Sequence, residues 1–413
     1  MPQPPPADLR TRLSGAGVVA ASITAMNVAT YGFTLVAARL LEPRYFGELT
    51  ALMGIILVGN VAALGLQATT ARRLATESDP ERQAAVIRAA RRATWISAAC
   101  VCGGALAISP LLQSILDLTS WWSTVLVAAT LGPLTVFGTQ AGIAQGRRRW
   151  GRLAVLYASV GAGRLAFGSL AAVLDPSPTT AMVGVFVGSL IPVVAGLPLL
   201  RTDPPAGEAT AADPATGGSR SVLVETLHGT HALLAYFALT NADAVLARIV
   251  LSPHDSGVYA AGLIVTKACL FLPQFVTIVA YPDLARAVDN RTRRIAALLI
   301  AALGGCVVAG TWLLPDLALA FVGGEEYADV RSLLPLFALE GSTFALVHLL
   351  LYDALARRSR VIVVGLWTAL AAASVVVLVS VDRIGPMPAI MTAAAAGVAL
   401  VAVVPIRARS STP

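Results

Sequence analysis

Apolar runs long enough to cross a lipid bilayer recur from one end of this chain to the other. A membrane-spanning helix needs about 20 mostly apolar residues to cross about 30 Å of hydrocarbon. Twelve runs approach or exceed that length, at residues 14–41, 47–71, 93–116, 122–145, 153–174, 180–200, 223–250, 257–281, 295–318, 331–353, 361–381 and 388–406. The segments between them are too short to form folded soluble domains. We therefore predict an all-α polytopic membrane protein with about 12 transmembrane helices.

A short sequence element occurs twice, once in each half of the chain. The first copy runs from Arg39 through Pro43 to Gly47, and the second runs from Arg248 to Gly257 with one residue inserted before its proline. The two Pro-x-x-x-Gly elements are 210 residues apart, close to half of the 413-residue chain, and both are predicted to lie on outer loops. Repeats of equal topology imply two six-helix bundles around a central cavity, related by an axis along the membrane normal.

The segment between the two halves is rich in Pro, Gly, Ala and Thr without apolar periodicity, which is typical of a linker. The predicted organisation is a disordered cytoplasmic N-terminus at 1–13, an N-terminal bundle at 14–200, a cytoplasmic linker at 201–222, a C-terminal bundle at 223–406 and a cytoplasmic tail at 407–413. The first apolar run is too long for the core of a signal peptide, so it is predicted to be an uncleaved first span.

The placement of basic residues predicts the orientation of the chain. With the N-terminus inside, 23 of the 30 Lys and Arg residues fall in segments assigned to the cytoplasm, as the positive-inside rule requires. Both termini are therefore predicted to be cytoplasmic, and the net charge of +7 reports topology rather than a nucleic-acid partner. High Ala, Gly and Arg content with a single Lys suggests a GC-rich bacterial genome, so the bacterial plasma (inner) membrane is the predicted location.

A polar segment, 72–92, separates the second and third apolar runs. Its residues Ser78–Glu81 read Ser-Asp-Pro-Glu, which predicts a helix start because an N-cap before proline and an acid in the first turn favour initiation. Arg88, Arg91 and Arg92 follow on one face of that helix, where they either contact anionic lipid headgroups or anchor the topology.

The stretch Leu239–Asp283 predicts two membrane-spanning helices joined by a tight turn at Ser252–Ser256. Asp243 lies about 10 Å before the turn and Lys267 about 15 Å after it, at 1.5 Å per residue. A lysine side chain is long enough to cover that difference in depth. Because charge is costly in hydrocarbon, such residues face a bundle interior or an aqueous cavity, and they mark a transport path or a structural pair.

The same hairpin carries a family resemblance. Its elements are Asn241-x-Asp243, Ala247-Arg248, Leu251-Ser252-Pro253, Gly257-x-Tyr259-x-Ala261, Lys267, Leu272-Pro273 and Pro282. In this order they resemble the central hairpin of oligosaccharide flippases, the polysaccharide-export (Wzx-like) branch of the multidrug/oligosaccharidyl-lipid/polysaccharide exporter superfamily. The resemblance implies two lobes that rock to alternate access, and arginines in the cavity that meet an anionic lipid headgroup. It also implies a lipid-linked saccharide as substrate, with polysaccharide assembly proteins as possible partners.

Four basic residues are candidates for contact with that headgroup. Arg164 lies near the middle of the run 153–174 among glycines, and it is read either as part of a packed ion pair or as a phosphate or pyrophosphate ligand. Lys267 is the second mid-depth cation. Arg39 and Arg248 lie near the outer ends, where they either contact substrate or anchor loops.

Three acids are candidates for coupling transport to H⁺ or Na⁺, namely Asp243, Glu340 and Asp353. ATP is not predicted as the energy source, because the single Lys rules out the sequence Gly-x-x-x-x-Gly-Lys-Ser/Thr. No catalytic residue, cofactor or metal site is predicted, since His228 and His231 lack further convincing ligands.

Polar residues inside the apolar runs are candidates for lining the cavity: Asn27, Asn60, Gln67, Asn241 and His348. Asn60 and Gln67 share a face with Met53, because seven residues are close to two helical turns. Hydrogen bonding between helices explains such residues equally well. His348 lies on the face that carries Glu340, and that face is read either as a proton path or as a structural partner for arginines.

Two other functions remain open. A multidrug or cation antiporter of the same superfamily needs an acidic, aromatic cavity, whereas the embedded charges here lean positive and aromatic residues are 6%. A polytopic glycosyltransferase or ligase generally needs a large loop outside the membrane. The longest outer segment, Phe321–Asp329, is short, although it holds Glu325, Glu326 and Asp329. The predicted function is therefore a flippase rather than an enzyme.

Overall fold

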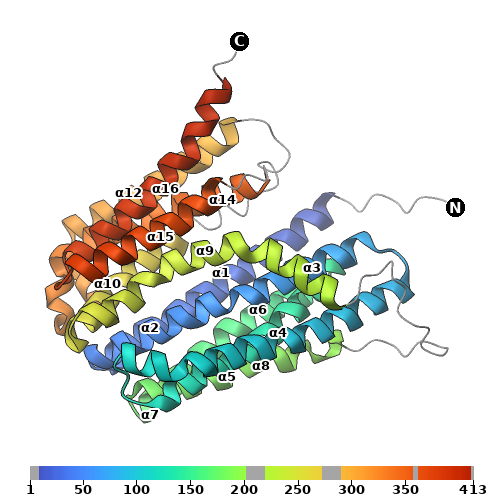
Figure 1. The fold of residues 1–413 in the computed structure, drawn as a ribbon, viewed down its shortest axis with the longest axis horizontal. Coiled ribbons are helices and arrows are strands. Elements are labelled where there is room, and N and C mark those ends of the chain that lie inside the picture. The colour runs from blue at the N-terminus through green and yellow to red at the C-terminus, as the bar shows by residue number, and fades with distance from the viewer. Residues whose placement is uncertain (1–8, 201–218, 272–289, 357–360, 411–413) are drawn as a thin grey trace.

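The computed structural model describes residues 9–200, 219–271, 290–356 and 361–410 (Figure 1). Within these ranges every element is helical. Ten of the described helices or continuous helix pairs are long and apolar enough to cross a membrane. Two further helices, α10 (Pro253–Phe271) and α16 (Pro386–Ser410), coincide with the other two predicted spans. The predicted all-α polytopic fold is confirmed.

The N-terminal lobe contains the helices up to residue 200, which pack mainly on one another. They are α1 (Leu9–Leu40), α2 (Pro43–Gly59), α3 (Val61–Thr76), α4 (Pro80–Ile115), α5 (Trp121–Gly146), α6 (Trp150–Gly163), the π-helix η1 (Arg164–Gly168), α7 (Ser169–Leu174) and α8 (Pro178–Leu200). Asn60 separates α2 from α3, and η1 joins α6 directly to α7. The predicted spans at 47–71 and 153–174 each remain one continuous span, Pro43–Thr76 and Trp150–Leu174, with a local irregularity inside it.

The C-terminal lobe contains α9 (Ser219–Val250), α10, α12 (Asn290–Leu313), α13 (Pro315–Val322), the 3₁₀-helix η3 (Glu325–Leu333), α14 (Leu334–Ala356), α15 (Val361–Ser380) and α16. The ribbons of the two lobes converge at one end, called here the apex, which holds the turn at residues 41–42 and the turn at 251–252. Helices α12, α14, α15 and α16 diverge from the N-terminal lobe toward the opposite end, called the terminal end, whereas α9 stays against α3 and α4 there (Figure 1).

Several helices extend beyond their predicted bounds at the terminal end. Helix α1 begins at Leu9 rather than residue 14, α9 begins at Ser219 rather than 223, and α16 continues to Ser410. Backbone hydrogen bonding continues a helix past the hydrocarbon edge, so hydropathy alone makes the helix too short. The rest of the predicted N-terminal segment and most of the predicted linker lie outside the described residues, as does the end of the span 257–281.

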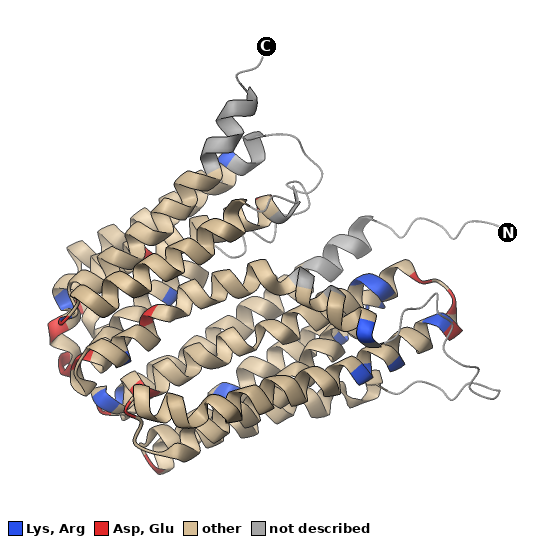
Figure 2. Cartoon of the chain, viewed as in Figure 1, with Lys and Arg blue, Asp and Glu red and all other residues tan. Residues whose placement is uncertain are grey.

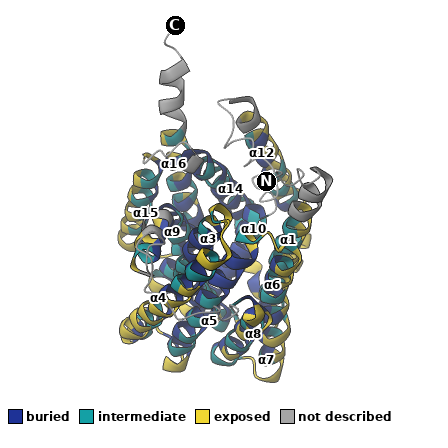
Figure 3. Cartoon of the chain, turned by 90° about the vertical axis from the view of Figure 1, so that its right-hand side faces the viewer, coloured by how far each residue is buried: buried dark blue, intermediate teal, exposed yellow. Residues whose placement is uncertain are grey.

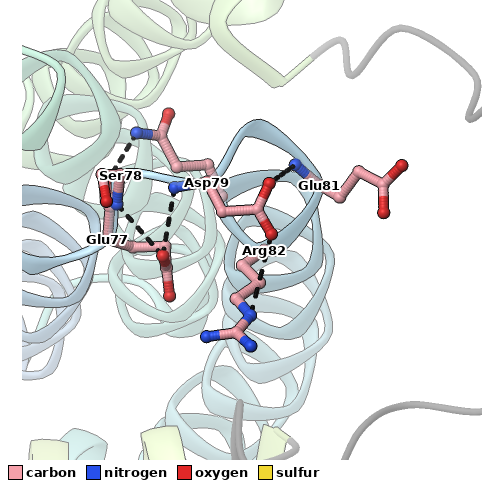
Figure 4. A network of polar contacts seen from close by, with 6 residues as sticks. Glu77, Ser78, Asp79, Glu81 and Arg82 are labelled. Carbon is pink, nitrogen blue, oxygen red and sulfur yellow. Dashed lines mark hydrogen bonds and ion pairs between the residues drawn. The ribbon is translucent and has the colours of Figure 1, made fainter. Parts of the chain in front are cut away.

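The predicted helix start at Ser78–Glu81 is confirmed. The Asp79 side chain accepts a hydrogen bond from the backbone N–H of Glu81 at 3.2 Å and lies 3.7 Å from the Arg82 guanidinium (Figure 4). Glu77 accepts from the backbone N–H groups of Ser78 and Asp79, which orders the turn before the helix. The basic segment and the following span are thus one continuous helix, α4.

Charge and burial divide the molecule as a bilayer requires. Most charged residues lie at the two ends of the helices, and basic residues gather where α3 approaches α4 at the terminal end (Figure 2). Viewed from that end, exposed residues face outward on α4 and α15, whereas buried residues face the middle (Figure 3). Apolar side chains on the outside, such as Val379, Trp312 and Leu298, fit contact with lipid tails.

The two Pro-x-x-x-Gly elements pack directly against each other at the apex. A Cβ atom added to Gly257 would lie 1.8 Å from the backbone oxygen of Pro43, and one added to Gly47 would lie 2.7 Å from the Ser256 hydroxyl. Only glycine permits two helix starts to approach this closely. The repeated element therefore forms the contact at which α2 meets α10.

Candidate functional site

Three ionisable residues from different helices meet inside the C-terminal lobe. Asp243 comes from α9, Lys267 from α10 and Glu340 from α14. Both acids are completely buried, whereas Lys267 is half-buried. Each acid interacts electrostatically with the Lys267 ammonium group. The structure thus brings together one candidate cation and two of the three candidate acids.

The Lys267 ammonium is held by the backbone and side chain of α9. It donates a hydrogen bond to the Asn241 side-chain oxygen at 3.0 Å and another to the backbone oxygen of Thr240. Asn241 in turn donates to the backbone oxygen of Phe237 at 2.8 Å, which fixes the amide with its oxygen toward the lysine. The ammonium therefore has a fixed position opposite the carboxyl groups.

The two carboxyl groups contact each other. The Asp243 and Glu340 side chains are within hydrogen-bonding reach, and such a contact needs one proton between them. Asp243 Oδ1 accepts from the backbone N–H of Ala244 at 2.8 Å, but Asp243 Oδ2 and both Glu340 oxygens meet no backbone or side-chain N–H or hydroxyl donor among the described residues. The nearby Tyr259 hydroxyl is also buried without a hydrogen-bond partner.

Charge at this cluster is balanced by one ammonium group and one shared proton. A carboxyl pair that shares a proton carries one negative charge, and Lys267 carries one positive charge. Desolvated charges are tolerated in a membrane protein when they are compensated in this way. The arrangement can exchange a proton at the carboxyl pair, and it presents oxygen atoms from Asp243, Glu340, Tyr259 and Asn241 around one cation.

Arg164 occupies a different kind of environment in the N-terminal lobe. It is the first residue of the π-helix η1, and only 9% of its surface is exposed. No acid and no hydrogen-bond acceptor contacts its guanidinium group among the described residues. A π-helical turn within a transmembrane helix is frequently found at a functional site.

Glycines beside Arg164 let three helices approach closely. A Cβ added to Gly163 would lie 2.4 Å from the backbone oxygen of Gly188 on α8, and one added to Gly161 would lie 2.7 Å from the Met26 Cα atom on α1. These glycines therefore allow close helix approach. This packing buries the arginine backbone without supplying a counter-ion.

The two apex arginines make structural hydrogen bonds. Arg248 donates to the backbone oxygen of Leu116 at 2.9 Å, to that of Asp117 at 2.8 Å and to the Ser256 hydroxyl at 3.3 Å. Asp117 has a positive φ of 45°, so the guanidinium caps a left-handed turn after α4. Arg39 donates to the backbone oxygen of Ala320 at 3.1 Å. Arg248 thus anchors the turn after α4, as one of the two interpretations anticipated, whereas Arg39 contacts the last turn of helix α13.

Glu48 belongs to the same apex network, although it is not among the residues that sequence analysis selected. It is completely buried in α2, accepts hydrogen bonds from the Thr119 N–H at 3.1 Å and the Thr119 hydroxyl at 3.2 Å, and interacts electrostatically with Arg248. Its place directly after Gly47 in the repeated element is the signal that could have revealed it.

The remaining polar candidates are dispersed. Gln67 donates to the Gln145 side chain at 3.0 Å and to the Tyr157 hydroxyl at 2.7 Å, which joins α3, α5 and α6 within one lobe. Asn60 lies at the junction of α2 and α3, and its side-chain oxygen is buried without a donor. Asn27 is partly buried on α1.

His348 and Asp353 follow Glu340 along α14. His348 stacks on Tyr236 and meets the edge of Tyr352, with both ring centroids at 4.9 Å. Asp353 is buried, but thirteen residues of helix, or about 20 Å, separate it from Glu340. The three candidate acids therefore do not form a single cluster.

The described residues contain no group of three or more His, Cys, Asp or Glu side chains arranged for a metal ion. Glu325, Glu326 and Asp329 are all exposed on η3. A groove of about 390 Å³ lies between α12 and α14, lined by residues such as Gly305, Trp312 and Leu339. Its lining is almost entirely apolar, which suits lipid contact rather than a saccharide.

Comparison with known proteins rests on the fold alone. No family model and no curated protein matches the sequence. A multidrug resistance MATE family transporter of the MOP superfamily, in an inward-facing conformation, superposes with a TM-score of 0.71 at 12% identity over 96% of this chain and 100% of that chain. The lipid II flippase MurJ, in an inward closed conformation, gives 0.72 at 9% identity over 94% of this chain and 87% of that chain.

A third solved structure is a MOP superfamily transporter from Pyrococcus furiosus, described as having a binding pocket of reverse polarity that suggests a different function. It gives a TM-score of 0.60 at 14% identity, over 94% of this chain and 96% of that chain. Low identity with extensive superposition establishes architecture without establishing substrate. The chain has the two-lobed helical fold of MOP superfamily transporters.

Proposed function

We propose that this protein is a flippase that moves a lipid-linked oligosaccharide or polysaccharide precursor across the bacterial plasma membrane by alternating access. The observation that carries the proposal is Arg164. It is a buried, unpaired guanidinium group within the N-terminal lobe. The other strongly buried arginine, Arg248 at the apex, donates hydrogen bonds to two backbone carbonyls and one hydroxyl group.

An unpaired buried cation has a chemical preference. Leaving a charge in the bilayer without a counter-ion is costly, and an anionic ligand would remove that cost. The planar guanidinium fork suits phosphate and pyrophosphate oxygens, to which it can donate two parallel hydrogen bonds. A pyrophosphate-linked isoprenoid such as an undecaprenyl carrier supplies this anion together with the saccharide.

Transport would require the apex to open. The two lobes meet there through Gly47 and Gly257, through the Arg248 hydrogen bonds, and through Tyr327, whose hydroxyl donates to the backbone oxygen of Ala38 at 3.0 Å. Buried apolar residues of both lobes also form one core cluster at the apex, so the proposed rigid-body rocking of the lobes would separate apolar as well as polar contacts. The predicted orientation would place the apex outside and both termini in the cytoplasm.

Coupling to an ion gradient is proposed for the C-terminal lobe. Asp243 and Glu340 share a site that can gain or lose a proton as the lobes move. Asp353 stays a separate candidate because of its distance along α14. Polysaccharide assembly proteins are proposed as partners only on the ground of the family resemblance.

A second candidate is a multidrug or cation antiporter, and one observation favours it. The buried Asp243–Glu340 pair resembles what an organic cation requires, and two MATE-type structures share the fold. The occupied position of Lys267 argues against it, because a cation already faces these acids. Arg164 would also repel a cationic drug from the N-terminal lobe.

The test is to deplete the protein in its host and label lipid-linked saccharides with a membrane-impermeant probe. The flippase proposal predicts that a complete intermediate accumulates on the cytoplasmic face, where the probe cannot label it. Expression of the wild type should restore labelling, and expression of Arg164→Ala should not. Arg383→Ala, which removes an exposed apex arginine, serves as the matched control and should restore labelling. Intermediates truncated by one sugar would favour a glycosyltransferase, and altered drug sensitivity with unchanged intermediates would favour the antiporter.

A further inference from the structure

The cluster in the C-terminal lobe has the ligand chemistry of a cation site, yet it already contains a covalently attached cation. Hard metal cations take carboxylate, carbonyl and amide oxygens as ligands. Asp243 and Glu340 supply carboxylate oxygens, Thr240 supplies a backbone carbonyl and Asn241 supplies an amide oxygen. The Lys267 ammonium donates hydrogen bonds to the Thr240 carbonyl and the Asn241 amide oxygen.

The unpartnered atoms point to the same site. Asp243 Oδ2, both Glu340 carboxyl oxygens and the Tyr259 hydroxyl are buried and, apart from the contact between the two carboxyl groups, have no hydrogen-bond partner among the described residues. Buried oxygens without partners are rare in folded proteins, and each one calls for an explanation. Here all four belong to residues that interact electrostatically with one another around the Lys267 side chain.

Charge counting shows why a metal ion would be redundant. The carboxyl pair with its shared proton carries one negative charge, and the ammonium cancels it. Among the described residues, Asp243, Glu340, Lys267 and Tyr259 are the titratable groups at the cluster. A metal ion would bring a second positive charge beside the ammonium, where burial strengthens their repulsion.

We propose that the Lys267 ammonium is the resident cation of this site and excludes Na⁺ and K⁺ from it, so that the Asp243–Glu340 pair exchanges only a proton. The inference rests on the proposed ion-coupling role of these carboxyls, but not on the identity of the cargo. It makes a lysine side chain the substitute for a bound alkali cation.

Removing the lysine should convert the cluster into a metal-ion site. In Lys267→Met the apolar side chain keeps similar length but loses the charge, and the oxygens of Thr240 and Asn241 lose their donor. Na⁺ can then take the position of the ammonium, since it is small enough to sit among the same oxygens. Ligand binding to the folded state raises its melting temperature with ligand concentration.

The experiment uses the full-length purified protein in lipid nanodiscs, with Na⁺, K⁺ or choline as chloride salts at constant ionic strength. The wild type should show the same melting temperature in all three salts and no saturable binding of ²²Na⁺. Lys267→Met should show a melting temperature that rises with Na⁺ concentration at pH 8 to 9, where the low proton concentration favours Na⁺ over H⁺ as the ligand of the carboxyl pair. Asp243→Asn added to Lys267→Met should abolish that rise.

Arg164→Met is the matched control, because it removes the other mid-span cation and should create no Na⁺ response. Saturable ²²Na⁺ binding to the wild type that Asp243→Asn abolishes would overturn the proposal, and this measurement does not depend on whether Lys267→Met folds. The absence of a Na⁺ response in both Lys267→Met and Lys267→Gln, when folded, would also overturn it. Neither readout needs substrate, so failure here is distinguishable from failure of the flippase proposal.

Discussion

The two lobes carry their buried charge in opposite ways. In the C-terminal lobe Lys267 faces two carboxyl groups, and its donors are occupied by Thr240 and Asn241. In the N-terminal lobe Arg164 has no partner among the described residues, although it is equally removed from water. A balanced cluster is complete without a ligand, whereas an isolated cation is not. This difference is the basis for proposing proton exchange in one lobe and anion binding in the other.

The largest effect on stability is expected from Lys267→Met in the absence of Na⁺. Removing one partner from a compensated buried cluster leaves an uncompensated carboxylate and typically costs about 3–5 kcal/mol. Thermal unfolding in nanodiscs, followed by intrinsic fluorescence, measures the loss. An unchanged melting temperature in choline chloride would show that Lys267 does not balance the carboxyl pair.

Arg248→Met should have the next largest effect, because it removes three hydrogen bonds from a buried guanidinium at the apex. Hydrogen bonds to charged groups contribute about 1.5–3 kcal/mol, so a loss of about 2 kcal/mol is expected. Arg39→Met, which removes one bond at an exposed position, should cost less than about 0.5 kcal/mol. Equal losses of stability in the two variants would show that buried Arg248 contributes no more to the apex than exposed Arg39 does.

Glu340→Gln should have a smaller effect on stability. The amide group can still donate a hydrogen bond to Asp243, so the lost interaction amounts to about 1 kcal/mol or less. Proton exchange at the pair should nevertheless cease, and a pH gradient should no longer drive transport. Gradient-driven uptake in proteoliposomes measures this, and an undiminished response to ΔpH would exclude Glu340 from coupling.

Arg164→Met should have the smallest effect on stability and a complete effect on transport. The substitution removes a buried charge that has no partner to lose, so unfolding should not become easier by more than about 0.5 kcal/mol. The same unfolding assay measures this, with Lys267→Met as the contrasting variant. A loss comparable to that of Lys267→Met would mean that Arg164 has a structural counter-ion, in agreement with the ion-pair interpretation.

The sequence was sufficient for the architecture and for single embedded charges. Hydropathy located the spans, because every residue in hydrocarbon must satisfy its backbone within a helix. Depth along the helix identified Arg164, Asp243 and Lys267 one by one. The contact between Asp243 and Glu340 could not be predicted from the sequence, since it joins helices about 100 residues apart and depends on how each helix is rotated about its axis. The repeated Pro-x-x-x-Gly element was recognised as a repeat, but not as two surfaces that touch.

Local backbone irregularities were also beyond reach. Nothing in the pattern of residues 153–174 distinguishes an α-helix from one with a π-turn at Arg164, and the two differ in which face the arginine occupies. Likewise, nothing in the pattern around Asn60 indicates the junction of α2 and α3 at that residue. The predicted shared face assumed an uninterrupted helix.

The most direct test of the asymmetry between the lobes is to measure binding of a short-chain polyprenyl pyrophosphate to the purified wild type, Arg164→Met and Lys267→Met. The account predicts that Arg164→Met lowers the affinity at least about tenfold, equivalent to about 1.4 kcal/mol, while Lys267→Met in Na⁺ keeps the wild-type affinity. If Lys267→Met lost binding and Arg164→Met kept it, the anion site would lie in the C-terminal lobe and the account would be wrong.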